Sequence, residues 1–345
     1  MKKVKIFNAL AAVALLIVFS NCKKAVVQPE LNINYKAAFV VNGASTTISV
    51  VDLATETVKA TIPFDGNYPH HIYLSPDKTK FAIAFTGQDL SGGHAGHGSG
   101  SAFKVVVVDA VKGQNALSLD LTAMPHNAVF SPDGSELWLG QSDATASKVL
   151  ILNALDLKEK ARVTVGKGLS EVTFSADGSK VYAANTTDNT VSVINPTTKA
   201  VTTTIPVGAA PVGAWTATNG KMYVDNETAQ TVSEIDVATS AITATINLGF
   251  KPGYVAYNAI LKELWVSDAT NGKVVYYKLV NNVWAKQGDF ATGADAHAIA
   301  FSKDGAKAYV TNQGAQTVSI VTAATHTKVK DIAVGDKPNG VVLTD

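Results

Sequence analysis

The chain has 345 residues, a formal net charge of +1 and one arginine, Arg162. Nucleic-acid-binding proteins carry a basic patch and phosphate recognition favours the arginine fork, so the composition excludes a nucleic-acid partner and counts against phosphorylated substrates. The one cysteine, Cys22, excludes an internal disulfide bond.

The first residues have the pattern of a targeting signal. Three lysines within the first five residues precede an apolar stretch over residues 9–19, which is too short to span a membrane as a helix. Cys22 follows soon after and resembles the lipidated cysteine of a bacterial lipobox, although Asn21 stands where that motif has a small residue. We therefore predict a lipoprotein-type signal peptide over residues 1–21 and a tether over residues 22–34. The alternative is a plain secretory signal with an incidental cysteine.

This segment also predicts a location. We expect a protein of the bacterial cell envelope that is held to the membrane through a lipid on Cys22 and faces the periplasm. No acidic run follows the cysteine, so the sequence carries no clear surface-export tag, although exposure at the cell surface stays open.

Seven copies of one pattern fill the rest of the chain. Their opening positions are spaced by 56, 44, 42, 41, 44 and 42 residues: Pro69, Pro125, Leu169, Pro211, Pro252, Ala296 and Pro338. The copy from Pro125 has four short segments rich in β-branched or aromatic residues, at 128–131, 136–140, 148–153 and 161–165. A period of roughly 40–45 residues with four short strands is typical of one blade of a β-propeller.

The two ends of the chain together supply the seventh unit. Eight residues run from Pro338 to Asp345 and 34 run from Tyr35 to Tyr68, which together equal one repeat of 42. We therefore predict an all-β, seven-bladed β-propeller over residues 35–345, with four strands in each blade and the ring closed by pairing of the N- and C-terminal segments. Such closure removes the exposed sheet edges that favour aggregation, and we expect a monomer.

A short motif recurs in several copies. It reads Tyr309-Val310-Thr311-Asn312 in the clearest copy, with variants at Tyr182–Asn185, Tyr223–Asn226, Trp265–Asp268 and Phe39–Asn42. The motif and its spacing resemble the YVTN family of β-propeller repeat proteins over nearly all of residues 35–345. The resemblance implies the propeller fold and a setting outside the cytoplasm. It implies no particular chemistry, because this fold hosts binders, scaffolds and enzymes alike.

Topology predicts where polar residues of the repeats meet. If the four strands of each blade alternate in direction, the connections between blades and those between second and third strands lie on one face of the ring. The residues directly after the opening positions then surround the mouth of a central channel on that face: His70, His126, Ser170, Val212, Gly253, His297 and Asn339. The three histidines fall in one arc and should converge. Further candidates for contacts at this rim are Asn127, Glu171, Tyr254 and Asn339.

The long spacing of 56 residues contains an insertion, Gly87–Gly100, which is rich in glycine and holds His94 and His97. The topology puts this loop on the face of the histidine arc. Histidines without thiols in an oxidising compartment suit Cu(II) or Zn(II), so we predict a transition-metal site. Its candidate ligands are His70, His71, His94, His97, His126 and His297. The alternative is that the rim histidines only pack against the channel and that the insertion is a flexible segment.

No serine–histidine–aspartate spacing, phosphate-binding loop or carboxylate pair is readable in the sequence. We therefore expect an envelope-anchored, non-enzymatic binding or scaffold protein. Its channel-mouth face would take a protein or small-molecule ligand, and its histidines would hold the metal. The alternative is a propeller enzyme, either a lactonase-like hydrolase or a copper-dependent oxidoreductase. The lack of arginine near the rim counts against a lactonase. The pair His70-His71 is similar to a histidine pair of nitrous oxide reductase, but the cysteine-bearing domain of that enzyme has no counterpart here.

Replacing Cys22 with alanine tests the lipid anchor. Because the thiol would carry the lipid, Cys22→Ala should move the protein from the membrane fraction to the soluble envelope fraction. Immunoblots of the two fractions measure the shift, and equal partitioning of variant and parent would rule the anchor out.

Overall fold

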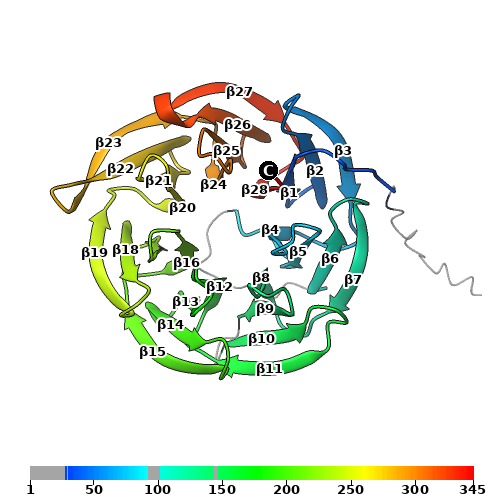
Figure 1. The fold of residues 1–345 in the computed structure, drawn as a ribbon, viewed down its shortest axis with the longest axis horizontal. Helices are drawn as coiled ribbons and strands as arrows, with labels where there is room; N and C mark the ends of the chain where they lie inside the picture. Colours follow the sequence, from blue (N-terminus) through cyan, green and yellow to red (C-terminus); the bar gives the residue numbers. More distant parts are fainter. Residues whose placement is uncertain (1–27, 29, 92–101, 143–146) are drawn as a thin grey trace, which may run out of the picture.

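In the computed structural model, seven four-stranded antiparallel sheets stand in a ring around a common centre (Figure 1). The structure describes residues 28, 30–91, 102–142 and 147–345. Each sheet is one blade, and the blades are numbered by the chain order of their innermost strands. This architecture confirms the prediction of an all-β, seven-bladed propeller.

From the innermost strand outward, blade 1 consists of β4 (Pro69–Leu74), β5 (Lys80–Phe85), β6 (Lys104–Asp109) and β7 (Gln114–Asp120). Blade 2 consists of β8 (Pro125–Phe130), β9 (Glu136–Gln141), β10 (Lys148–Asn153) and β11 (Glu159–Thr164). Blade 3 consists of β12 (Leu169–Phe174), β13 (Val181–Asn185), β14 (Thr190–Asn195) and β15 (Ala200–Pro206). Blade 4 consists of β16 (Pro211–Thr216), β17 (Lys221–Asn226), β18 (Thr231–Asp236) and β19 (Ala241–Asn247). Blade 5 consists of β20 (Pro252–Asn258), β21 (Glu263–Asp268), β22 (Lys273–Val280) and β23 (Val283–Ala291). Blade 6 consists of β24 (Ala296–Phe301), β25 (Lys307–Asn312), β26 (Thr317–Thr322) and β27 (Thr327–Ala333), with the short 3-10 helix η1 (Ala323–Thr325) before β27. Blade 7 consists of β28 (Pro338–Leu343), β1 (Ala37–Asn42), β2 (Thr47–Asp52) and β3 (Thr57–Pro63). Because every blade repeats one order, equivalent residues of the seven innermost strands face one centre.

β28 closes the ring. It pairs antiparallel with β1, with Leu343 opposite Ala38, so the last strand is the innermost strand of the blade that the first three strands build. Beyond the strand, the Thr344 N–H donates to the Ala37 carbonyl oxygen over 2.9 Å. The predicted joining of the two chain ends is confirmed.

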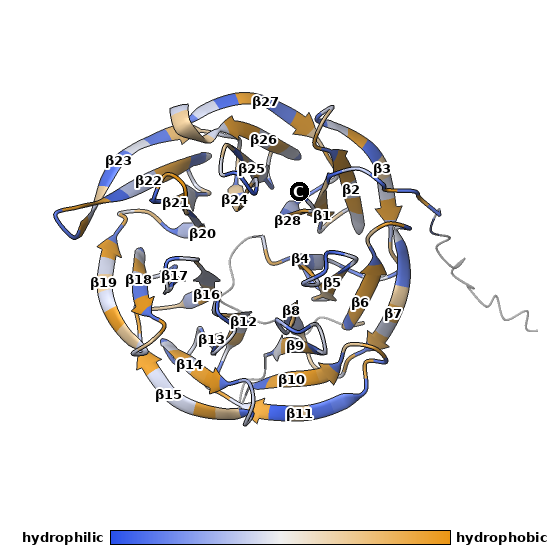
Figure 2. Ribbon diagram, in the orientation of Figure 1, coloured by the Kyte–Doolittle hydropathy of each residue, from blue (hydrophilic) through white to orange (hydrophobic). Residues whose placement is uncertain are grey.

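The apolar core is divided among the contacts between neighbouring blades. The described residues form seven clusters of buried side chains, one at each contact between blades. Side chains alternate along a strand, so one strand supplies two clusters: Phe81 and Ile83 of β5 face blade 7, whereas Ala82 faces blade 2. Figure 2 shows the resulting contrast between largely hydrophobic middle strands such as β10 and mixed outer strands such as β7.

An asparagine at the end of the second strand ties two strands together. In blade 6, Asn312 Nδ2 donates to Thr317 Oγ1 over 3.0 Å and to Ser319 Oγ over 2.9 Å. Blades 3, 4 and 7 repeat the arrangement with Asn185, Asn226 and Asn42. The residue that packs against the side chain of Asn312 has to be a glycine, because a Cβ on Gly293 would lie 2.8 Å from Asn312 Cγ. The asparagine of the repeated motif is therefore a structural residue.

The described residues before β1 lie along the β6–β7 turn of blade 1. The Leu31 N–H donates to the Lys112 carbonyl oxygen over 2.8 Å, and the Ile33 N–H donates to that of Val111 over 2.9 Å. The described part of the chain has no helix of the length and apolar character needed to cross a bilayer. Cys22 and the predicted signal peptide lie outside the described residues.

Deleting Pro338–Asp345 should open the ring. The edge of β1 would be exposed, and buried side chains such as Val341 and Leu343 would lose their contacts. Two buried aliphatic side chains alone contribute about 3–6 kcal/mol, so the free energy of unfolding should fall by at least about 3 kcal/mol. Chemical denaturation measures this change. A truncated protein that unfolds at the parent's denaturant midpoint would contradict the closure.

Candidate functional site

The innermost strands are irregular near their first residues, which aims side chains at the centre. In blade 1, the register of β4 against β5 shifts between His70 and Ile72, and the intervening His71 has a positive φ of 47°. Register shifts recur near the start of the innermost strands of the other blades. Such a bulge re-aims a side chain, so His71 reaches the centre while His70 lies beside blade 2.

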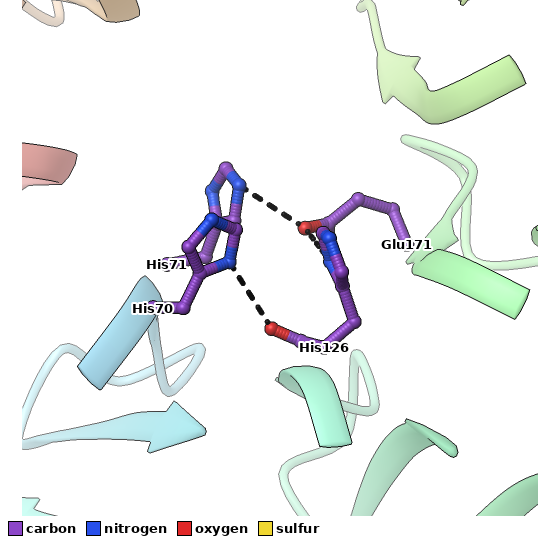
Figure 3. Close-up of side chains that lie close together, drawn as sticks. All are labelled: His70, His71, His126 and Glu171. Atoms are coloured by element: carbon purple, nitrogen blue, oxygen red, sulfur yellow. Dashed lines mark hydrogen bonds and ion pairs between the residues drawn. The ribbon is translucent and has the colours of Figure 1, made fainter. Parts of the chain in front are cut away.

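Four side chains from three blades bring one nitrogen or oxygen atom each to within 4.8 Å of one another (Figure 3). Glu171 Oε1 of β12 lies at a hydrogen-bond distance of 2.9 Å from His126 Nδ1 of β8 and 3.2 Å from His71 Nε2 of β4. His70 joins through its Nδ1, which donates to the His126 carbonyl oxygen over 3.4 Å. These four residues are named the His–Glu cluster.

The His–Glu cluster is buried, with His126 and Glu171 both 0% exposed. Burial raises the pKa of the Glu171 carboxyl well above its ordinary value, and the Asp225 carboxylate adds to the rise. The Tyr73 hydroxyl, which donates to Glu171 Oε2 over 3.0 Å, opposes this shift in pKa. The charge of this carboxyl therefore depends on its neighbours, which is typical of functional sites.

Aromatic rings from blades 4, 5 and 6 form the opposite side of the centre. The centroid of the His71 ring lies 5.7 Å from that of Trp215 and 6.3 Å from that of Tyr254. The His297 ring lies 5.8 Å from His71. Asp225 Oδ1 holds Trp215 in place, because it accepts a hydrogen bond from the indole Nε1 over 2.7 Å. His71, a member of the His–Glu cluster, therefore also lies beside the aromatic side.

His297 is anchored by β28. Its Nδ1 donates to the Asn339 carbonyl oxygen over 3.0 Å, and Asn339 Nδ2 donates to the Pro69 carbonyl oxygen over 3.0 Å. A carbonyl oxygen only accepts, so Nδ1 of His297 carries the proton and Nε2 is the basic nitrogen. Gly253 lies beside the Cδ2–Nε2 side of the ring, since a Cβ there would be 3.6 Å from His297 Cδ2.

A cavity of about 370 Å³ opens beside His297. Residues from four blades line it, among them Leu90, Glu227, Lys251, Thr270, Asp295 and His297. The lysine of this lining is paired, with 3.0 Å between Lys251 Nζ and Glu227 Oε2. Burial raises the pKa of the Asp295 carboxyl. The cavity is therefore bordered by a basic imidazole and lined by carboxyl and hydroxyl groups.

The structure gathers six of the predicted site residues at the centre: His70, His71, His126, Glu171, Tyr254 and His297. Two of the predicted rim residues bind the backbone of a neighbouring blade, and Asn127 also hydrogen-bonds the Glu171 carboxyl. Asn127 Nδ2 donates to the Val172 carbonyl oxygen over 2.7 Å, and Asn339 bonds Pro69 as described above. His94 and His97 lie outside the described residues.

Three residues of the centre were not predicted from the sequence: Tyr73, Trp215 and Asp225. A signal exists for Asp225, which directly precedes the asparagine of the repeated motif. Other copies have an uncharged residue at this position, such as Val41, Ala184 and Thr311, so a charged residue there stands out. Tyr73 and Trp215 carry no such signal, because an aromatic residue in a strand is typical of ordinary packing.

No protein-family model matches the chain, and no curated protein matches it. Solved structures match its fold. A periplasmic gluconolactonase from Pseudomonas aeruginosa is similar with a TM-score of 0.73 and 16% identity, over 90% of this chain and 99% of that chain. A candidate 6-phosphogluconolactonase from Bacteroides fragilis is similar with a TM-score of 0.70 and 16% identity, over 91% and 99% of the two chains. A dihydro-heme d1 dehydrogenase in complex with DHE is similar with a TM-score of 0.65 and 16% identity, over 92% and 79% of the two chains.

At these identities the likenesses show the fold. They also contradict the expectation of a non-enzymatic binding or scaffold protein, because these neighbours are described as enzymes and two of them as lactonases. The expectation rested on the lack of a readable catalytic motif. In this fold, however, neighbouring groups such as His71, His126 and Glu171 come from three different blades and leave no local motif.

Replacing Asp225 tests its role at the centre. Asp225→Ala should lower the free energy of unfolding by about 2–4 kcal/mol, because it removes the acceptor of the Trp215 Nε1–H and of the Gly213 N–H, which donates over 2.9 Å. Asp225→Asn keeps an acceptor oxygen and is the matched control. Urea denaturation measures both variants, and equal losses would show that Asp225 does not anchor Trp215.

Proposed function

We propose that this protein is a lactonase-like hydrolase that opens a small, uncharged cyclic ester at the mouth of the propeller. The observation that carries the proposal is His297, which borders the cavity of about 370 Å³ while its Nδ1 is anchored to Asn339. A volume of this size lies within the range of small-molecule sites. The likeness to a periplasmic gluconolactonase supports the reaction class.

Lactone hydrolysis needs a base for the attacking water and a proton for the ring oxygen. His297 Nε2 takes a proton from water while the water oxygen bonds to the ester carbonyl carbon. The bond between that carbon and the ring oxygen then breaks, and the imidazolium returns the proton to the departing oxygen. The product is the open-chain hydroxy acid, and the histidine ends in its starting form.

The charges around the cavity favour an uncharged substrate. Glu227 and Asp295 present carboxyl groups, and Lys251 is already paired with Glu227. Arg162 lies on the outermost strand of blade 2, where it bonds both carboxylate oxygens of Glu159 over 2.8 Å. A phosphate group would therefore meet no arginine fork, whereas carboxyl and hydroxyl groups can bind the hydroxyls of a sugar-like lactone.

We also propose that the hydrolase works in the bacterial envelope as a lipoprotein. Cys22 after an apolar stretch supports the lipid anchor, and the neighbour from Pseudomonas aeruginosa is described as periplasmic. The motif at Tyr309–Asn312 and its variants support membership of the YVTN family.

Hydrolysis of a panel of lactones by the purified full chain tests the proposed reaction. Glucono-δ-lactone should be opened well above its spontaneous rate, and its 6-phosphorylated form should have a kcat/KM at least about tenfold lower. The amide of His297→Asn can still donate to the Asn339 carbonyl oxygen but supplies no base. This variant should therefore lower kcat by about 100-fold or more while keeping a thermal midpoint close to that of the parent.

His326→Asn is the matched control. His326 Nε2 bonds Glu263 Oε2 over 2.8 Å at the end of β21 that lies away from the mouth, so this variant should keep the parent's kcat. Spontaneous rates for all five- and six-membered lactones tested, or an unchanged kcat in His297→Asn, would reject the proposal.

A further inference from the structure

We propose that the His–Glu cluster is a binding site for one divalent transition-metal ion, zinc or copper. Glu171 Oε1, His126 Nδ1 and His71 Nε2 are its first three ligands, and His70 completes the set. The inference goes beyond the proposed hydrolase, whose base is His297, because metal binding is measured without any substrate.

The spacing of the donor atoms suits a metal ion. One donor atom from each of the four residues lies within 4.8 Å of the other three. A tetrahedral ion with bonds of about 2.0–2.2 Å holds its ligands roughly 3.3–3.6 Å apart. Glu171 Oε1 is already 2.9 Å from His126 Nδ1 and 3.2 Å from His71 Nε2. An ion can therefore replace the protons between these atoms with small movements of the side chains.

The chemistry of the donors also suits such an ion. The side chains that bond the Glu171 carboxyl include those of His71, His126, Tyr73 and Asn127, and none of these is a lysine or an arginine. A carboxylate in a protein interior is costly unless a positive charge lies beside it. A divalent ion supplies that charge. Neutral imidazoles together with a carboxylate are ligand types that both zinc and copper accept.

Neighbouring groups hold the ligands in position. The Tyr73 hydroxyl bonds the second carboxyl oxygen, Glu171 Oε2. His70 Nδ1 donates to the His126 carbonyl oxygen, so the lone pair of this ring is on Nε2, as in many metal sites. Among the described residues, His71 is the one non-glycine residue inside a strand with a positive φ. Strained backbone conformations of this kind cluster at functional sites.

Calorimetric titration of the untagged, chelator-treated full chain with Zn(II) and Cu(II) tests the site, with Mg(II) as a probe for an oxygen-rich site. We expect one Zn(II) or Cu(II) ion per chain with a Kd below about 1 μM, and no comparable binding of Mg(II). The near-isosteric variants Glu171→Gln and His126→Asn should each weaken binding by about 100-fold. The electron paramagnetic resonance spectrum of the Cu(II) form should show coupling to at least two imidazole nitrogens.

The control is again His326→Asn, which removes the described histidine–carboxylate pair outside the centre and should bind metal like the parent. Thermal melts show which variants fold, and the nitrogen coupling in the parent's spectrum decides the question if a cluster variant does not. Binding weaker than about 10 μM, parental affinity in both cluster variants, or a Cu(II) spectrum without nitrogen coupling would overturn the proposal. A loss of binding that occurs only in a His94→Ala/His97→Ala double variant would overturn it as well, whereas retained binding in that variant supports it.

Discussion

The pairing of β28 with β1 is the constraint on which the rest of the molecule depends. Seven blades can surround one centre only if the last strand returns to the first sheet, and the apolar contacts between blades are all satisfied only in a closed ring. The same strand builds the site. Asn339 of β28 bonds His297 of blade 6 on one side and the Pro69 carbonyl oxygen of blade 1 on the other. The last strand therefore sets how the cavity lies relative to the His–Glu cluster.

The centre of the ring divides into two chemically different halves. Blades 1 and 2 contribute imidazoles around the buried carboxyl of Glu171 from blade 3, whereas blades 4 to 6 contribute aromatic rings and most of the lining of the cavity beside His297. His71 touches both halves, and it does so only because the bulge in β4 turns its side chain toward the centre. The two proposals therefore concern neighbouring chemistry while remaining separately measurable.

The sequence predicts the fold because one pattern repeats at a regular spacing, and the incomplete copies of it at the two chain ends together make one blade. It predicts the meeting of His70 and His126 for the same reason, since both occupy one position of the repeat. What it does not predict comes from distances between blades. The anchoring of Trp215 by Asp225 depends on a bulge in β16, and the cavity depends on loops from four blades, including Leu90 of blade 1. The prediction of a non-enzymatic binding or scaffold protein was wrong for a related reason. A site assembled from separate blades leaves no motif along the chain.

The split blade also has a consequence for the order of events during folding. The strands β1 to β3 leave the ribosome early, but the strand that completes their sheet follows about 275 residues later. At a synthesis rate of about 5–20 residues per second, this delay is roughly 14–55 s. During that time the β1 edge has no β28 to pair with and is open to wrong partners. A chain that ends before β28 also keeps the edge of β1 exposed. Proteases and chaperones can recognise such an edge.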